Sequence, residues 1–447
     1  MVLFLVPEMI ASLNLRLVCA SILVSFVVAR VLFRRYATSI KDIPGPFWGS
    51  FSSLWVVYQL WKGHIEAETI NLHKKHGYFV RIRDNEVSVS HPDAVRQLLH
   101  ANIAKGPWYA IFSFPDYHYV NQMAELDPQR HLEKSRNVAS GYTLSNIIQS
   151  EPYVDAVLEL FIKHVDEHCN SGTPIELNHW FTYFAFDVVG EVTFSKSFGF
   201  VQTGTDVGNA IANTRALALY VSVMGHYTWF HNLTLGNPLL SRLGIQPSSH
   251  IFDTSLAAVK MRKENPKVRK DMMQQWLDTR AKYPDRMAEN EIFAAAAVNV
   301  AAGADTVGAT TQCLFYWLLH YPKHLRRLRE ELDTAQARGE LSPVIQYNEA
   351  KKNPTLFGED CNTFNPDRWL QGNTQRMDSF LIHWGAGYRQ CTGRNLAHFQ
   401  ISKLAATLIR DFEFEQVDPK KEWEWTNHFS ISPWGWPCKI RRRSIAG

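Results

Sequence analysis

Residues 384–393 read WGAGYRQCTG, and this stretch indicates the fold more strongly than any other part of the 447-residue chain. One cysteine, Cys391, stands between glycines that allow tight turns, and Arg389 precedes it by two residues. The segment that follows, 394–412, carries apolar residues at helical spacing, so we expect a helix that begins just after the cysteine. A helix N-terminus and a guanidinium both favour the anionic form of a nearby thiol. A thiolate in this setting is suited to ligating iron.

Other interpretations of the cysteine stretch are weaker. Free cysteines are most often small buried hydrophobic residues. A dinucleotide-binding Gly-x-Gly-x-x-Gly loop is excluded because Gln390 occupies the third glycine position. No second cysteine follows at the spacing of a zinc pair. The iron–thiolate interpretation is therefore favoured.

The stretch resembles the haem-ligand signature of the cytochromes P450, Phe-x-x-Gly-x-Arg-x-Cys-x-Gly, with Trp384 in place of the phenylalanine. The resemblance implies the cytochrome P450 fold, which is mainly α with a small β portion. It also implies heme b as the cofactor, with Cys391 as its axial ligand and with Arg389 and Arg136 holding its propionates. The glycines expected to take a positive φ or to let the backbone approach this flat ligand are Gly385, Gly387 and Gly393.

Arg136 belongs to the segment 131–136, HLEKSR, which resembles the helix that presents basic groups to the propionates. The family usually has a basic residue at the position of Ser135. Either Arg136 or His131 is therefore expected to take its place.

A long apolar segment, 291–320, stops before Pro322 and predicts a helix of about 45 Å. Helices that are apolar all round are either membrane spans or central helices of a folded core. Asn299 and the central Asp305 favour the core, because a carboxylate is costly in lipid. A protein with a second membrane span over 292–321 is the alternative that this carboxylate disfavours.

Residues 302–306 of this segment, AGADT, resemble the oxygen-activating element of the family. The resemblance implies that the Thr306 hydroxyl bonds to dioxygen and that Asp305 passes protons from solvent. Threonine can also donate to the carbonyl of the preceding turn. The next family position prefers Thr or Ser, and Val307 stands there, which weakens a proton or water relay.

The N-terminal region predicts a membrane anchor. Residues 17–33 read LVCASILVSFVVARVLF, close to the length of a membrane span, and the alternative of a cleaved signal peptide lacks a small-residue cleavage site. Basic residues after this run outnumber Arg16 before it, which predicts a single-pass protein with its mass in the cytosol. The resemblance to microsomal members of the family implies the endoplasmic reticulum membrane. The expected organisation is a short segment 1–16, the transmembrane anchor 17–33, a basic and Pro-rich hinge 34–47 and a haem-binding monooxygenase domain 48–447.

Composition and pattern add several expectations. The net charge of +4, without a basic run interleaved with aromatics, argues against a nucleic-acid partner. Six cysteines without paired spacing indicate a reducing compartment. Residues 76–91 alternate around a polar turn at 84–85, which predicts a β-hairpin. The aromatic-rich segments 106–119 and 217–230 stand where the family often forms loops over the substrate pocket.

One element of the family is missing from the sequence. No Glu-x-x-Arg occurs between residues 314 and 384, and Glu349-Ala-Lys-Lys352 has lysine where a planar guanidinium fork is needed. Residues 364–369, FNPDRW, resemble a later part of the family, so on the order of fifty or more residues near 350–354 are missing by length comparison. The missing piece would hold the partners of Arg368. A mis-spliced or mispredicted transcript explains this better than a degenerate gene, because the flanks keep their pattern.

The resemblance implies a haem-thiolate monooxygenase that hydroxylates or oxidises an apolar small molecule with dioxygen. The tail, at 422–425 and 438–441, is similar to fungal P450s of secondary-metabolite pathways. The implied partners are NADPH-cytochrome P450 reductase, docking on a basic surface near Arg394 and Lys403, and membrane lipid through the anchor. The alternative is a catalytically impaired, membrane-tethered haem-binding pseudoenzyme or a truncated gene product.

Overall fold

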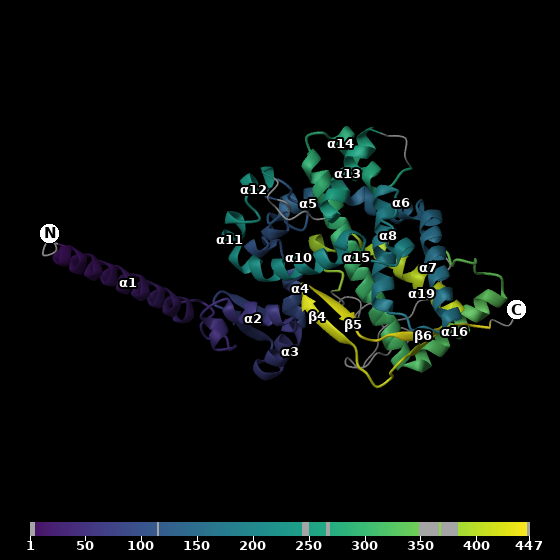
Figure 1. Ribbon diagram of the computed structural model, residues 1–447, viewed down its shortest axis with the longest axis horizontal. Helices are drawn as coiled ribbons and strands as arrows, with labels where there is room; N and C mark the ends of the chain where they lie inside the picture. Colours follow the sequence, from purple (N-terminus) through teal and green to yellow (C-terminus); the bar gives the residue numbers. More distant parts are fainter. Residues whose placement is uncertain are drawn as a thin grey trace. The chain divides into compact units, whose positions relative to one another are not determined.

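The computed structural model describes residues 5–113, 116–243, 250–264, 269–347, 366–367 and 383–444. It divides into two compact units, Met1–Leu98 and Leu99–Gly447 (Figure 1). Helices dominate both units, and the strands form only two-stranded sheets in the part of the chain described. The predicted fold class, mainly α with a small β portion, is confirmed.

The first unit consists of a long N-terminal helix and shorter helices around one hairpin. Strands β1 and β2 pair antiparallel on either side of residues 84–85, which confirms the hairpin predicted from the alternating pattern. The elements of this unit are α1 (Leu5–Tyr36), η2 (Trp48–Ser50), α2 (Leu54–Lys62), α3 (Ile65–His76), β1 (Phe79–Arg83), β2 (Glu86–Val89) and α4 (Pro92–His100), which leads into the second unit.

Helix α1 is long and apolar enough over Arg16–Tyr36 to cross a membrane, and none of this stretch is buried inside the protein. Exposed apolar side chains on an isolated helix are costly in water, which is why such a helix is a candidate membrane anchor. It covers the predicted anchor, 17–33.

A buried arginine binds the end of α1 to the hairpin. Arg81 is 1% exposed, and its guanidinium donates hydrogen bonds to the carbonyls of Arg34 (2.7 Å), Arg35 (3.1 Å) and Asp84 (2.6 Å). The last carbonyls of a helix have no partner within the helix, so Arg81 caps the C-terminus of α1. The Arg34 guanidinium in turn pairs with the Asp84 carboxylate at 2.6 Å.

The second unit is organised around α15 (Glu289–His320), the long apolar helix predicted from the sequence. Helix α8 (Leu177–Phe194) packs along it, and α19 (Arg394–Asp411) also contacts it. More than half of the apolar stretch of α15 is buried inside the protein, so α15 is a core helix as predicted. Helix α8 buries nearly all of its side chains, whereas α15 leaves a stripe exposed at Ala302, Thr306, Thr310 and Trp317.

The remaining elements of the second unit surround these three helices. Strand β3 (Phe412–Gln416) pairs antiparallel with β6 (Cys438–Arg442), and β4 (Glu424–His428) pairs antiparallel with β5 (Ser430–Trp434). The other helical elements are η3 (Pro107–Phe112), α5 (Pro128–Val138), η4 (Ala139–Tyr142), α6 (Leu144–Ile148), α7 (Glu151–Ser171), α9 (Phe200–Thr203), η5 (Val207–Asn209), α10 (Ala210–Met224), η6 (Gly225–Tyr227), α11 (Thr228–Leu233), α12 (Pro238–Arg242), α13 (His250–Glu264), α14 (Met272–Lys282), α16 (Pro322–Ala337) and η8 (Gly387–Arg389).

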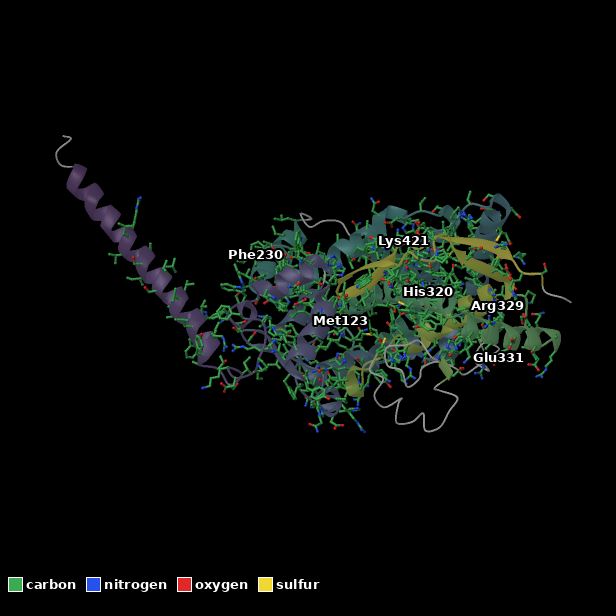
Figure 2. The ribbon with its side chains drawn as sticks, turned by 90° about the horizontal axis from the view of Figure 1, so that it is seen from below. Met123, Phe230, His320, Arg329, Glu331 and Lys421 are labelled. Carbon is green, nitrogen blue, oxygen red and sulfur yellow. The ribbon has the colours of Figure 1, made fainter. Side chains whose placement is uncertain are left out.

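Aromatic side chains join the helices of the core. The ring of Phe181 stacks on Phe161 of α7 (6.3 Å between centroids) and contacts Phe315 of α15 (5.0 Å). Figure 2 shows the side chains of this unit, with Phe230 of α11, which is 42% exposed, towards one edge. The core therefore lies between α7, α8, α15 and α19, and the candidate site lies beside it.

Lys403 corrects one prediction. It was expected on a basic surface near Arg394, but its side chain has no exposed surface. Its ammonium group lies 2.7 Å from Oε1 of Glu151 and 2.7 Å from Oδ1 of Asp155, both on α7. The prediction was wrong because these carboxylates lie about 250 residues away in sequence and only the tertiary fold brings them to α19. Of the two cations, Arg394 alone is exposed.

Candidate functional site

The cysteine stretch forms a tight loop ahead of α19. The backbone N–H of Cys391 donates to the carbonyl of Trp384 at 2.7 Å and closes the loop. Gly385 (φ +69°) and Gly387 (φ +60°) take the left-handed conformation that glycine tolerates best, which confirms the expectation for these two. Gly393 has φ −79° and precedes the first residue of α19, so it supplies no left-handed turn.

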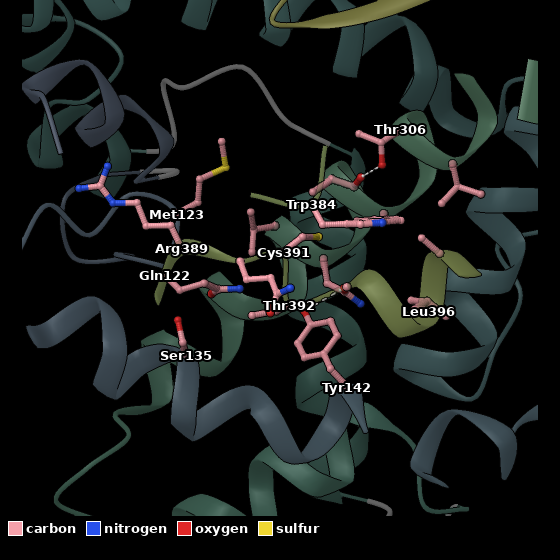
Figure 3. A pocket seen from close by; sticks show the side chains of 18 of the residues that line it. Gln122, Met123, Ser135, Tyr142, Thr306, Trp384, Arg389, Cys391, Thr392 and Leu396 are labelled. Carbon is pink, nitrogen blue, oxygen red and sulfur yellow. Dashed lines mark hydrogen bonds between the residues drawn. The ribbon is translucent and has the colours of Figure 1, made fainter. Parts of the chain in front are cut away.

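A cavity of about 340 Å³ lies between this loop and helices α5, α15 and α19. Figure 3 shows Cys391 of the loop and Thr306 of α15 among its lining side chains. The predicted site residues that line the cavity are Cys391, Thr306, Arg389 and Gly393. Those outside the lining are Asp305, Arg136, Gly385 and Gly387.

The thiol of Cys391 is accessible from the cavity, but the surrounding protein removes part of its contact with water. This enclosure raises the pKa of the thiol, whereas hydrogen bonds from the backbone N–H groups of Gly393 and Arg394 lower it. Burial outweighs these hydrogen bonds, so the pKa of the Cys391 thiol lies above its usual value, and the start of α19 offsets this rise only in part. The Arg389 guanidinium is directed elsewhere, since it donates to the hydroxyl of Tyr388 (2.9 Å) and to the carbonyl of Ile103.

Thr306 and Asp305 occupy different faces of α15. The Thr306 hydroxyl donates to the carbonyl of Ala302 at 2.6 Å, the bond to the preceding turn that the sequence predicts. Its lone pairs remain able to accept a hydrogen bond in the cavity. The Asp305 carboxylate is half-buried and accepts a hydrogen bond from the hydroxyl of Ser430 at 2.7 Å.

Three cationic or basic side chains line the same cavity: Lys105, His131 and Arg389. The Lys105 ammonium donates to the carbonyls of Gln122 (2.9 Å) and Met123 (2.8 Å) and lies 3.2 Å from Nδ1 of His131. Burial and the nearby charge of Arg389 lower the pKa of Lys105 to about 8. Burial and the charge of Lys105 likewise lower the pKa of His131. Mutual repulsion in an enclosed place favours an anionic ligand group between these side chains.

The face of α5 that lines the cavity distinguishes between its two candidate propionate ligands, His131 and Arg136. His131 is buried, lines the cavity and lies 3.2 Å through Nε2 from the carbonyl of Tyr388. Ser135, one turn further along, lines it too, because residues four apart share a helix face. Arg136 is exposed and does not line the cavity.

Sequence reasoning missed several polar residues of the cavity. Tyr142 is buried and donates to the amide oxygen of Asn299 at 2.9 Å, and burial with the nearby Cys391 raises the pKa of its phenol. Gln400 is fully buried in the lining, and neither polar atom of its amide has a hydrogen-bond partner among the described residues. Lys105 carries no signal in the sequence, because it is one lysine in a loop without a motif.

The aromatic-rich segments differ in their relation to the cavity. Tyr109, in segment 106–119, lines it. Segment 217–230 forms the end of α10, η6 and part of α11, and none of its residues is in the lining. The predicted pocket role therefore has support only for the first segment.

Several predictions concern residues outside the described part of the chain. These are the string 349–352, the interval at 350–354, Cys361 and Arg368. Asp367 is described, and its carboxylate pairs with Arg327 at 2.6 Å.

The residues of the cavity suit a metal ion that is already bound within a cofactor, rather than one held by several protein side chains. Among the residues described, no group of three or more His, Cys, Asp or Glu side chains is placed to hold a metal ion. A single thiol on one wall, basic groups at one edge and a mainly apolar surface with several polar side chains are compatible with a flat, apolar, dianionic metal complex.

The cytochrome P450 family model matches residues 43–350 and 344–433 of the chain. Among curated relatives, the cytochrome P450 monooxygenase gsfF of Penicillium aethiopicum is 27% identical over 492 residues, which cover 94% of this chain and 97% of the relative. A cytochrome P450 monooxygenase of Aspergillus terreus is 27% identical over 91% of this chain and 96% of its own. The cytochrome P450 monooxygenase cicH of Emericella nidulans is 26% identical over 93% and 97%.

Proposed function

The chain belongs to the cytochrome P450 family and is a haem b monooxygenase, and we propose that it oxidises an apolar small molecule of fungal secondary metabolism. When bound, haem b supplies the activation of dioxygen and the transfer of one oxygen atom to the substrate. The relatives named above are fungal monooxygenases, which supports the pathway class. The cavity that brings Cys391 and Thr306 together is the observation that carries the proposal.

Cys391 is the proposed axial ligand. Its thiol is the one sulfur among the cavity-lining residues described that can become a thiolate. The N–H groups at the start of α19 point to the sulfur and favour its anionic form. Gly385 and Gly387 are proposed to shape the loop. Gly393, which has no side chain, is proposed to leave space beside the sulfur.

The basic residues of the cavity are proposed to hold the haem propionates. Arg389 was expected in this role, and the cavity lining supports it. Arg136 was expected too, but its exposed position favours His131 and Lys105 in its place. Lys105 thus supplies from a loop the positive charge that the family usually carries at the position of Ser135.

Thr306 and Asp305 are proposed to manage protons. The Thr306 hydroxyl donates to Ala302 and leaves its oxygen able to accept, so it can hold a proton donor at the cavity wall. Asp305, one residue away, is half-buried and can exchange protons with solvent. Val307 is buried, so the relay that other members extend by a hydroxyl ends at Thr306 here.

The partners follow from the family and from α1. We propose that α1 anchors the protein in the endoplasmic reticulum membrane, over 17–33, with the hinge 34–47 and the monooxygenase domain 48–447 in the cytosol. Electrons would come from NADPH-cytochrome P450 reductase, and the remaining exposed cation of its expected docking surface is Arg394. Proteolysis at Pro44–Gly45 should release the domain from membranes as one piece.

We also propose that a segment is missing near 350–354. The alignment with gsfF has 492 positions, but 94% of 447 residues is about 420, so about 70 positions have no residue of this chain. The family model also matches in two pieces that overlap at residues 344–350. Both observations support the deletion, and sequencing the transcript across 350–354 would test it.

The missing Glu-x-x-Arg favours a second candidate function, a membrane-tethered haem-binding pseudoenzyme without turnover. The two candidates differ in oxidation activity but agree on haem binding. NADPH consumption with purified reductase and a panel of apolar substrates separates them.

The experiment on haem ligation uses the ferrous carbon monoxide spectrum of the purified protein. We expect the long-wavelength Soret band of a thiolate complex in the wild type and in Cys169→Ser, a control cysteine on α7. Cys391→Ser should lose this band. An unaltered spectrum in Cys391→Ser would overturn the assignment.

A further inference from the structure

The carboxylate that serves proton transfer is held by a residue from another element. Asp305 is the only acidic residue of α15 after Glu291, and its Oδ2 accepts a hydrogen bond from the hydroxyl of Ser430 at 2.7 Å. Ser430 is the first residue of β5, which packs against α15. A hydrogen bond to a charged group contributes more than one between neutral groups, so this contact fixes the orientation of the carboxylate.

The turn that presents Ser430 has an unusual backbone. His428 pairs with Ser430, which leaves Phe429 alone at the tip of the β4–β5 hairpin. Phe429 has φ +79°, a conformation that a bulky residue adopts only when its surroundings hold it there. The position of Ser430 is therefore determined by the contacts of the hairpin tip.

Those contacts lead to the cavity. The ring of Phe429 stacks on Trp108 (5.9 Å between centroids) and packs on Phe112 (5.0 Å), both in η3. Tyr109 of the same η3 lines the cavity. The rings that contact Phe429 and the cavity-lining Tyr109 thus belong to the same short helix.

We propose that Ser430 is a positioning residue for Asp305 and that Trp108, Phe112 and Phe429 hold the hairpin tip that presents it. The inference rests on the proposed function. In that reaction the substrate gains one oxygen atom, and the other leaves as water, which takes up two electrons from NADPH and two protons. Ser430 acts on the delivery of those protons by holding the carboxylate that carries them.

The test compares Ser430→Ala with Ser430→Thr, which keeps a hydroxyl, and with Ser432→Ala, which removes the same group two residues along β5. The first readout is deuterium exchange of peptides covering 299–310 and 424–434 in the purified protein. We expect Ser430→Ala to raise exchange several-fold in both peptides and the other two variants to match the wild type. Equal exchange in Ser430→Ala and wild type would overturn the inference, with or without turnover.

The second readout is the ratio of oxidised product to NADPH consumed. Ser430→Ala should lower this ratio about fivefold and raise the solvent deuterium isotope effect, with rescue by Ser430→Thr. Oxidation driven by hydrogen peroxide should stay within about twofold, because peroxide brings its own electrons and protons (RH + H₂O₂ → ROH + H₂O). If the wild type is active and Ser430→Ala gives the same ratio of oxidised product to NADPH consumed, the inference is overturned but the proposed function is not. A wild type without the thiolate carbon monoxide band overturns the proposed function instead.

Discussion

Trp108 packs directly on Gly225: a Cβ atom at Gly225 would overlap the indole ring. The ring cannot retreat freely, because Phe112 and Phe429 contact it from other sides. Glycine is thus required at Gly225 for space, since its backbone is helical (φ −58°) and would accept any residue.

We expect Gly225→Ala to lower the free energy of unfolding by about 1–3 kcal/mol, the usual cost of an overpacked site. The measurement is the midpoint of chemical denaturation. Gly106→Ala is the matched control, because a Cβ there meets no atom within 4 Å. Similar midpoints for the two variants would contradict the close packing of Trp108.

Lys403 provides a second prediction. Replacing it with methionine leaves the carboxylates of Glu151 and Asp155 without their common cation. Breaking one side of a buried ion pair costs about 3–5 kcal/mol, so thermal unfolding of Lys403→Met should occur at a clearly lower temperature. The control is Lys439→Met on an exposed position of β6, which should change little. A stability of Lys403→Met equal to the control would mean that the ion pairs do not form.

Lys105→Met tests the assignment of the propionate contacts. A hydrogen bond to a charged group contributes about 1.5–3 kcal/mol, which corresponds to haem affinity about 10- to 150-fold weaker in the variant. Haem titration of the purified protein measures it. Arg136→Met, on the exposed side of α5, should bind haem like the wild type. Weaker haem binding by Arg136→Met than by Lys105→Met would instead support Arg136 as a propionate ligand.

The lowered pKa of Lys105 predicts a dependence of stability on pH in haem-free protein. The folded chain releases this proton near pH 8, whereas the unfolded chain keeps it to about 10.5. Between these values the unfolded state binds more protons, so the contribution of this group to folding stability rises with pH. From pH 8 to 10, the free energy of unfolding of the wild type should therefore rise relative to that of Lys105→Met, as measured by denaturation at each pH. Parallel curves would show that the ammonium is not enclosed.

The sequence was most informative where the chemistry is local. The turn glycines Gly385 and Gly387, the α19 that follows Cys391, and the hairpin β1–β2 depend on neighbours a few residues away. The long helix α15 was predictable because its apolar composition excludes an exposed position. Its place in the core rather than in a membrane was predicted from Asn299 and Asp305, which would be costly in lipid.

Long-range pairing explains what could not be predicted. Lys105 meets Arg389 and His131 only after folding, and as a single lysine it resembles a surface residue. Whether His131 or Arg136 faces the cavity depends on the rotation of α5 against its neighbours. The contact between Ser430 and Asp305 joins residues 125 positions apart, and no sequence pattern in either segment predicts it.

The cap that Arg81 places on α1 matters for anyone who shortens this protein to obtain a soluble form. A variant that starts after Tyr36 loses the carbonyls of Arg34 and Arg35 and leaves part of a buried guanidinium without acceptors. Each such donor without an acceptor costs about 1–3 kcal/mol, and this cost destabilises the hairpin β1–β2 rather than the removed helix. Trimming should therefore stop upstream of Arg34.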